Sequence, residues 1–320
     1  MGKRILVTGG AGFIGSNIVR GLLGKGYDVV VLDNFMTGRR ENIKDILDDI
    51  ELLEGDIRDN PTCMNACSKV DAVLHQAALP SVPRSVADPL LTNEVNITGT
   101  LNLLLAVRDK GIENFIFASS SSIYGDTEIL PKVETMKPSP LSPYALQKLT
   151  AEYYVRLFAE LYGLRSLSMR YFNVFGPRQD PKSPYAAVIP LFIRAARDGS
   201  QVTIYGDGEQ SRDFTFVDNV VMANILALET KRLDGQVVNI ACGKRYTLND
   251  TLRILEDISS RSIPRKYENP RLGDVKHSQA DISRANEVIG YTSTVGFEEG
   301  LKSTFNYFHS QEFPYNITEP

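Results

Sequence analysis

A tyrosine and a lysine stand four residues apart in the string SPYALQK, as Tyr144 and Lys148. On a helix, residues at positions i and i+4 lie on the same face, one above the other. A cation in that position favours the phenolate and lowers the pKa of a tyrosine from about 10 towards neutrality, so that the tyrosine can act as a general base. The pattern also fits an ordinary surface helix with an amphipathic tyrosine and a solvated lysine, and the pair alone does not decide between the two.

The N-terminal string TGGAGFIGS carries glycines with the spacing GxxGxxG, at Gly9, Gly12 and Gly15. It follows an apolar run and opens a helical stretch, as in the dinucleotide fingerprint, whose glycines permit a tight turn and the close approach of a pyrophosphate to a helix N-terminus. A second apolar run ends in Asp33, which suits a ribose hydroxyl and would repel a 2′-phosphate. The pattern predicts a dinucleotide site that takes NAD in preference to NADP.

Short apolar runs rich in β-branched residues alternate with helix-length segments through the first half of the chain. Because these runs are continuously apolar, they are typical of strands buried on both faces of a parallel sheet and joined by right-handed βαβ crossovers. The predicted strands span residues 4–9, 28–33, 50–56, 71–78, 114–120 and 164–172. We therefore expect an α/β fold with a doubly wound parallel sheet of the Rossmann type.

Two of the helical stretches, 88–111 and 142–163, are long and apolar around much of their circumference. In the second, Leu146, Leu149 and Tyr153 begin an apolar row that continues along one side. A helix of this kind usually buries two faces. One face would pack on the sheet and the other on a second copy of the chain, so we expect a homodimer joined through a four-helix interface.

The pattern changes after about residue 172, where glycine and proline punctuate shorter elements such as 173–184 and 205–213. We expect an NAD-binding Rossmann domain over residues 1–172 and a smaller α+β substrate lobe over residues 173–320, packed on the carboxyl edge of the sheet. Some of the later segments are expected to cross back to the first domain.

The composition is that of a soluble globular protein, since 42% of the 320 residues are hydrophobic and 23% are charged. A net charge of −4 argues against broad binding to nucleic acid or to an anionic membrane. The three cysteines form no disulfide framework, and the three scattered histidines indicate no metal site. The first apolar run begins at once, with no signal peptide and no apolar stretch of membrane-spanning length, so we expect a cytoplasmic protein.

Together, the glycine turn, the serine run at 120–122 and the tyrosine–lysine pair resemble the extended short-chain dehydrogenase/reductase family, and the resemblance covers essentially the whole chain. Within that family the sequence is most similar to UDP-hexose 4-epimerases. The resemblance implies an NAD-dependent enzyme that inverts carbon 4 of a UDP-hexose through a transient 4-keto sugar. Tyr144 would remove the proton of the 4-hydroxyl, and Ser120 would bond to the same oxygen. Lys148 would hold the nicotinamide ribose and, with the positive nicotinamide ring, favour the phenolate.

The resemblance also assigns binding residues position by position. The expected cofactor contacts are Gly9, Gly12, Phe13, Ile14, Gly15, Asp33, Asn34, Asp56, Ile57, Gln76, Ala77, Ala78, Tyr144 and Lys148. The expected substrate contacts are Ser120, Ser121, Asn173, Gln179, Ala187, Val188, Arg212, Arg271, Asp274 and Ser278. Taken singly, Arg212 or Arg271 could be an ordinary surface charge, and their order within matching strings is what assigns them to the diphosphate.

In this family the position of Ser278 lies against the C2 substituent of the hexose, and a bulky aromatic there tends to restrict an enzyme to glucose and galactose. The small residue in this sequence implies room for an acetamido group, so the expected substrates are UDP-GlcNAc and UDP-GalNAc, together with UDP-Glc and UDP-Gal. Pro80 stands where the N-acetyl-preferring relatives have glycine, which argues against a strict preference.

Alternative functions differ in the residues that they require. A sugar-nucleotide 4,6-dehydratase would need a carboxylate pair beside the catalytic residue, and the string from Ser120 to Ile123 has none. A UDP-glucuronate 4-epimerase or decarboxylase would need cations or hydroxyls for the sugar carboxylate, which the sequence cannot place. A non-catalytic, NAD-sensing regulator would keep the fold without any need for the Ser–Tyr–Lys set.

Overall fold

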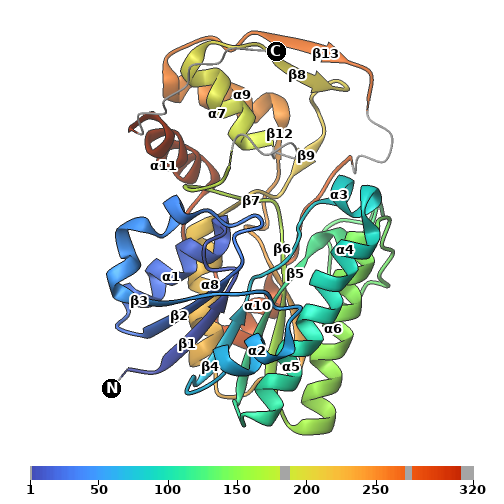
Figure 1. Ribbon diagram of the computed structural model, residues 1–320. Coiled ribbons are helices and arrows are strands. Elements are labelled where there is room, and N and C mark those ends of the chain that lie inside the picture. The colour runs from blue at the N-terminus through green and yellow to red at the C-terminus, as the bar shows by residue number, and fades with distance from the viewer. Residues whose placement is uncertain (1, 181–187, 271–275, 311–320) are drawn as a thin grey trace.

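A seven-stranded parallel sheet forms the centre of the molecule (Figure 1). The computed structural model describes residues 2–180, 188–270 and 276–310. The strands, in their order across the sheet, are β11 (Gln236–Ile240), β6 (Arg165–Tyr171), β5 (Asn114–Ser120), β4 (Ala72–His75), β1 (Arg4–Thr8), β2 (Asp28–Asp33) and β3 (Ile50–Glu54). All neighbouring pairs run parallel, and the order reverses between β1 and β4. The expectation of a doubly wound parallel sheet is confirmed.

Alternate residues of the strands face two separate apolar cores. In β1, Ile5 and Val7 belong to one core and Leu6 to the other. The first core is covered by α1 (Phe13–Gly24), α8 (Val217–Glu229) and α10 (Ser283–Ile289), and the second by α2 (Asn60–Ala66), α5 (Gly99–Asp109) and α6 (Pro143–Tyr162). Because both faces of the sheet are buried, its strands read as continuous apolar runs rather than as an alternating pattern.

Helix α6 has both ends set by local sequence signals. The Ser142 side chain accepts a hydrogen bond from the backbone N–H of Ala145 at 3.2 Å, and Pro143 occupies the first helical position. Gly163 ends the helix in the left-handed conformation, with φ of 70°. The helix therefore matches the stretch predicted at 142–163.

The stretch predicted as one helix at 88–111 is divided by a π-helical turn. The parts are α4 (Pro89–Asn93), the turn η3 (Glu94–Thr98) and α5, with the short α3 (Val82–Ala87) before them. The turn carries the buried Asn96, whose Oδ1 accepts from the N–H of Leu79 at 2.8 Å and whose Nδ2 donates to Gln147 at 2.9 Å. These bonds tie η3 both to the loop after β4 and to α6, and they account for the departure from a regular helix.

A smaller lobe lies beyond the carboxyl ends of the strands, in the upper part of Figure 1. Its elements are α7 (Val188–Asp198), α9 (Leu248–Ser259), α11 (Phe297–Ser310) and the parallel pair β8 (Val202–Tyr205) and β13 (Arg265–Glu268). Two short pairs lie between lobe and sheet, β7 (Val174–Phe175) with β10 (Thr215–Phe216) and β9 (Ser211–Arg212) with β12 (Tyr246–Thr247). The lobe has its own apolar core, which includes the stacked rings of Phe214 and Phe297.

Three elements from beyond residue 172 complete the sheet half of the molecule. Strand β11 pairs with β6, while α8 and α10 cover the sheet face that carries α1. Sequence analysis missed β11 because its five residues QVVNI, half-buried at the first two, give no long apolar run. Among the helices of the described ranges, none combines the length and the apolarity needed to cross a lipid bilayer.

Candidate active site

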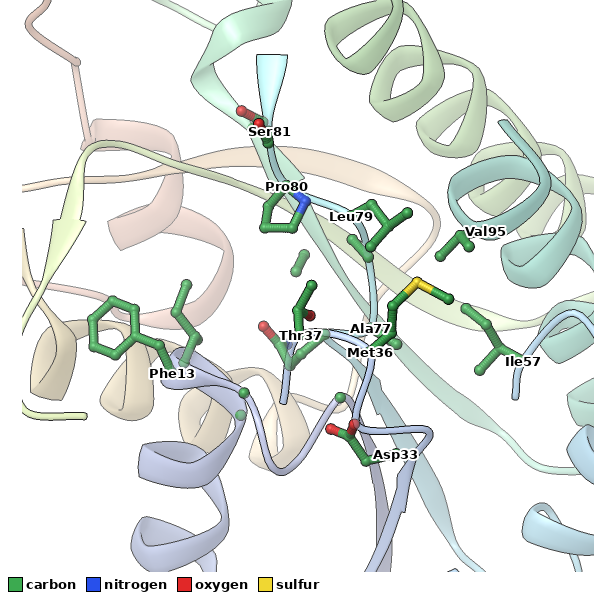
Figure 2. Close-up of a pocket in the computed structure, with 18 of the residues that line it drawn as sticks. Phe13, Asp33, Met36, Thr37, Ile57, Ala77, Leu79, Pro80, Ser81 and Val95 are labelled. Carbon is green, nitrogen blue, oxygen red and sulfur yellow. The ribbon is translucent and has the colours of Figure 1, made fainter. Parts of the chain in front are cut away.

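One large cavity, of about 460 Å³, lies at the carboxyl ends of the strands, where doubly wound folds bind their ligands. Figure 2 shows Asp33 on one side of it and Pro80 and Ser81 on the opposite side. The residues predicted from the sequence that line it are Gly9, Gly12, Phe13, Ile14, Gly15, Asp33, Asn34, Asp56, Ile57, Gln76, Ala77, Ala78, Ser120, Tyr144, Lys148, Asn173 and Gln179. The structure thus brings the expected cofactor contacts and the expected catalytic residues to a single cavity.

The glycine turn leaves no room for side chains at the start of α1. A Cβ atom on Gly9, whose φ is +68°, would lie 2.7 Å from the backbone N of Ala77, and one on Gly15 would lie 2.1 Å from the carbonyl O of Gly9. The helix begins at Phe13 without a side-chain cap, and its first turn lines the cavity. Exposed N–H groups at a helix N-terminus bind phosphate, so the turn fits the pyrophosphate of a dinucleotide.

Asp33 closes β2 and is held by backbone bonds on both of its carboxylate oxygens. Oδ2 accepts from the N–H of Ala11 at 2.9 Å, and Oδ1 accepts from the N–H of Phe35 at 2.8 Å. Burial raises the pKa of Asp33, whereas these two bonds lower it. Each oxygen keeps a further lone pair toward the cavity that the residue lines, which suits the hydroxyls of a ribose.

Apolar side chains gather at one end of the cavity. Figure 2 shows Met36, Ile57 and Val95 close together there. Asp56 lies beside Ile57 and also lines the cavity, and the hydrogen bond from Arg58 lowers the pKa of its carboxyl to about 2. An apolar slot with a charged carboxylate at its edge fits an aromatic ring that carries an amino group, such as adenine.

Of the expected catalytic pair, Lys148 is buried and Tyr144 is half-buried, and removal from water dominates the chemistry of both side chains. Burial raises the pKa of Tyr144 to about 12, and the hydrogen bond with the Ser120 side chain acts in the opposite direction. Lys148 is 4% exposed, and its Nζ donates to the carbonyl O of Ala118 at 2.8 Å. Burial lowers the pKa of Lys148 to about 7, while the charge of Glu152 opposes this shift.

The prediction assigns the Tyr144 phenolate to the combined charges of Lys148 and the nicotinamide ring, and it stays a prediction; in the protein alone, burial raises the pKa of Tyr144 and lowers that of Lys148. Removal from water disfavours the charged form of both groups, so the phenol keeps its proton and the amine tends to lose one. The Lys148 ammonium is also directed to the Ala118 carbonyl and lies 4.8 Å from the centre of the Phe117 ring. Formation of the phenolate requires a further positive charge in the cavity.

A buried ion pair behind Lys148 was not predicted from the sequence. Arg170 on β6 donates to the two carboxylate oxygens of Glu152 at 2.9 and 2.8 Å, and Ser119 donates to the same carboxylate at 2.5 Å. Both charged residues are 3% exposed, so the bidentate pair fixes α6 to the sheet. Glu152 follows Lys148 by one helical turn, but its pairing with Arg170 on another element leaves no local spacing in the sequence.

Two residues predicted to contact the substrate, Asn173 and Ser278, are hydrogen-bonded to each other. Asn173 lines the cavity with a φ of 35°, and its Nδ2 donates to the carbonyl O of Asp213 and to Oγ of Ser278, each at 3.1 Å. Both amide protons are thus engaged, so the side chain presents its carbonyl oxygen to any further partner. Gln179 also lines the cavity, and its Nε2 donates to the carbonyl O of Val174 at 3.4 Å.

Other predicted substrate residues lie outside the lining of this cavity. Of the described ones, Ser121, Val188, Arg212 and Ser278 do not line it, although Ser278 contacts it through Asn173. Arg212 on β9 donates to the carbonyl oxygens of Ser211 and Lys276, at 3.0 and 3.1 Å. The predicted contacts Ala187, Arg271 and Asp274 lie outside the described residues.

Several lining residues were missed by sequence analysis. They include Ser81, Arg84, Tyr171 and Asp180. Tyr171 ends β6, and the segment of Ser81 and Arg84 follows β4, so the rule that ligands meet the carboxyl ends of parallel strands could have found them. Asp180 carries no such signal, because its place depends on how the lobe meets the sheet.

Comparison with known proteins places the chain among sugar-nucleotide enzymes. Residues 5–241 match the model of the NAD dependent epimerase/dehydratase family. The chain is 43% identical to a UDP-N-acetylglucosamine 4-epimerase from Methanobrevibacter ruminantium M1, solved with UDP-N-acetylmuramic acid, at a TM-score of 0.91 over 96% of this chain and 98% of that one. It is 40% identical to the UDP-glucose 4-epimerase of Thermotoga maritima, solved with UDP-glucose, at a TM-score of 0.90 over 95% and 98% of the two chains.

A third similar structure is a UDP-glucuronic acid 4-epimerase from Bacillus cereus, solved with UDP-glucuronic acid and NAD. It is 33% identical to this chain, at a TM-score of 0.87 over 95% of this chain and 98% of that one.

Proposed function

Since this chain belongs to the NAD-dependent epimerase/dehydratase family, we propose that it is a UDP-hexose 4-epimerase that interconverts UDP-GlcNAc with UDP-GalNAc and also UDP-Glc with UDP-Gal. The observation that carries the proposal is that Ser120, Tyr144 and Lys148 line the same cavity as the glycine turn and Asp33. Residues able to move a proton thus share one site with residues able to hold NAD.

NAD, when bound, supplies a carbon that accepts a hydride and a positive charge that favours the Tyr144 phenolate. Tyr144 takes the proton of the sugar 4-hydroxyl, and Ser120 holds the same oxygen by a hydrogen bond. Lys148 holds the nicotinamide ribose. The sugar becomes a transient 4-keto sugar, which must turn over before it is reduced on its other face, while Asn173, Arg212 and Arg271 keep the UDP in place.

Small side chains support the acceptance of acetylated sugars. Ser278 bonds to the amide of Asn173, which lines the cavity, so a bulky ring at position 278 would press on the sugar side of the site. Overlap of this kind typically costs about 1–3 kcal/mol. Gln179 lines the cavity and has an amide that can bond to an acetamido group.

A UDP-glucuronate 4-epimerase or decarboxylase is the second candidate. It is favoured by Arg84 and Ser81, which line the cavity and could meet a sugar carboxylate. The relative from Bacillus cereus, solved with UDP-glucuronic acid and NAD, points in the same direction.

A panel of substrates separates these proposals. The purified protein is incubated with UDP-GlcNAc, UDP-Glc or UDP-glucuronate, and the nucleotide sugars are separated by chromatography and identified by NMR. We expect UDP-GalNAc and UDP-Gal as products. Conversion of UDP-glucuronate alone would favour the second candidate, and no conversion of any sugar by protein that carries NAD would leave the NAD-sensing regulator.

We also propose that the protein is a homodimer, for which the surface of α6 gives support. Leu146, Tyr153, Leu157 and Leu161 recur at helical spacing along one face, and all are at least 40% exposed. Leu90 on the neighbouring α4 is 70% exposed. A second copy of the chain would cover this face with the same apolar residues, as a two-fold symmetric interface requires.

A further inference from the structure

A short segment after β7 is bonded to the start of α1. We call residues 176–180 the strap. Arg178 donates through Nη2 to Oδ1 of Asn17 at 2.6 Å, and Asn17 donates through Nδ2 to the carbonyl oxygens of Pro177 and Phe13, at 3.1 and 2.8 Å. Asn17 is 5% exposed, so one buried amide joins the strap to the first turn of the helix that forms the phosphate cradle.

The strap is also joined to the loop that follows β2. Arg39 forms an ion pair with Asp180 at 3.4 Å, and its backbone N–H donates to the carbonyl O of Ala11 in the glycine turn at 2.9 Å. Gly12, Thr37 and Asp180 line the cavity together. The cavity lining therefore includes the glycine turn, the loop after β2 and the strap. The strap is bonded to α1, which follows the glycine turn, through Asn17 and to the loop after β2 through Arg39.

The backbone of this region is held in conformations that need outside support. Asn173 and Arg178 have positive φ angles of 35° and 69°, which cost a residue other than glycine roughly 1–3 kcal/mol each. Gly176 has a φ of 155°, and a Cβ atom there would lie 2.6 Å from Val217. Such conformations persist only where the surroundings impose them, so the bonds to Asn17 and Arg39 define the path of the strap.

We propose that Arg178 is a positioning residue that fastens the strap across the pyrophosphate end of the cofactor site, so that NAD stays bound while sugars exchange at the other end. This inference rests on the proposed function, in which the same NAD must accept and return the hydride. The Arg39–Asp180 pair is the second and weaker fastening, because both side chains are about 40% exposed.

The test measures release of NAD in the absence of any sugar. The holoenzyme is mixed with an excess of isotopically labelled NAD, and the bound label is followed by rapid gel filtration and mass spectrometry. We expect Arg178→Gln to speed exchange by roughly tenfold to hundredfold, as the loss of a half-buried hydrogen bond from a charged group implies. Arg39→Gln should speed it by only about two- to fivefold.

Two control variants remove a nearby arginine whose hydrogen bonds go elsewhere than the strap. Burial lowers the pKa of Arg178, and the nearby charge of Arg20 adds to this shift. Arg20 lies on α1 and donates to the carbonyl oxygens of Ser16 and Asn42, and Arg40 pairs with Glu54. Arg20→Gln and Arg40→Gln should exchange NAD at the rate of the unmodified protein. Should Arg178→Gln fail to fold, Arg178→Lys keeps one positive donor and should give an intermediate rate.

The steady-state constants give a second readout. With saturating NAD in the assay, Arg178→Gln should recover most of its kcat and keep the KM for the UDP-sugar, because only retention of the cofactor has changed. Unchanged exchange in Arg178→Gln, or equal acceleration in the two controls, would overturn the proposal. Normal retention of NAD in a protein that epimerises no sugar would instead refute the proposed function and leave the role of the strap intact.

Discussion

At the scale of single residues, Tyr144 has a role that can be separated from the binding of NAD. Its phenol is the proposed general base, whereas the glycine turn, Asp33 and Ile57 make up the lining where the cofactor is expected. We predict that Tyr144→Phe lowers kcat by about a hundredfold or more, the usual range for loss of a general base. The epimer formed from UDP-GlcNAc is measured, together with the NAD released on denaturation.

In that variant the NAD content should equal that of the unmodified protein. A control, Tyr162→Phe, removes a phenol at the far end of α6, where the side chain is 51% exposed, and should leave kcat unchanged. Near-normal turnover in Tyr144→Phe would show that Tyr144 is not the general base.

Ser278 is the residue at which the choice of sugar can be tested. Ser278→Tyr should lower kcat/KM for UDP-GlcNAc and UDP-GalNAc by roughly tenfold to a hundredfold, because the ring would take the space of the acetamido group. The values for UDP-Glc and UDP-Gal should change little. Equal losses for both pairs would mean that the variant disturbs Asn173, to which Ser278 is bonded, and that position 278 does not select the sugar.

At the scale of elements, the apolar face of α6 carries a prediction about assembly. Leu157→Glu places a charge in the middle of the exposed row, so a dimer held by this face should become a monomer in sedimentation experiments at micromolar concentration. Leu191→Glu, on the exposed side of α7, is the matched control and should sediment as the unmodified protein does. An unmodified protein that sediments as a monomer would remove the basis of the proposal.

The elements that sequence analysis found are those whose signals are local. Six strands were predicted from continuous apolar runs, and α6 was predicted from its length and its apolar pattern. Strand β11 was not predicted, because its apolar run is short and because its pairing with β6 depends on a long crossover through the lobe.

In the candidate site too, residues with local sequence signals were predicted and residues joined by long-range contacts were not. The glycine turn and the tyrosine–lysine pair act through spacings of three and four residues, so the sequence displays them. The Arg170–Glu152 pair and the strap join residues from different elements, and no local pattern announces such contacts. The rise that burial causes in the pKa of Tyr144 has no local signal either, since burial depends on the packing of the whole cavity.

At the scale of the whole molecule, a buried histidine couples stability to pH. His75 on β4 bonds through Nδ1 to Thr8 at 2.7 Å and through Nε2 to Thr100 at 2.9 Å. Thr100 gives its own proton to the carbonyl O of Asn96, so Nε2 carries the imidazole proton and the ring is neutral. Burial lowers the pKa of His75 to about 3.

The sign of the effect follows from the two states. The unfolded chain binds a proton at His75 below about pH 6.5 and the folded protein only below about pH 3, so acid favours unfolding between these values. We predict that this group alone lowers the free energy of unfolding by about 2 kcal/mol between pH 7 and pH 5. Urea titrations at the two pH values measure the difference.

In His75→Gln, the fall in the free energy of unfolding between pH 7 and pH 5 should be smaller by about 2 kcal/mol. This holds at any stability that the variant has at pH 7. His309→Gln, on an exposed side chain of α11, should leave the difference as it is. Identical pH dependence in all three proteins would show that His75 can take up a proton within the fold.

The late arrival of β11 has a consequence for how the protein is made. Strand β6 ends at Tyr171 and β11 ends at Ile240, so 69 residues of synthesis separate the sixth strand from the seventh. At about 5–20 residues per second, a nascent chain spends roughly 3–14 seconds with the outer edge of β6 unpaired. During the same interval α1 alone covers its face of the sheet, and the part that α8 and α10 later cover is exposed. Chaperones that bind apolar strands would meet the ribosome-bound chain in this window, and slow codons between residues 172 and 240 would lengthen it.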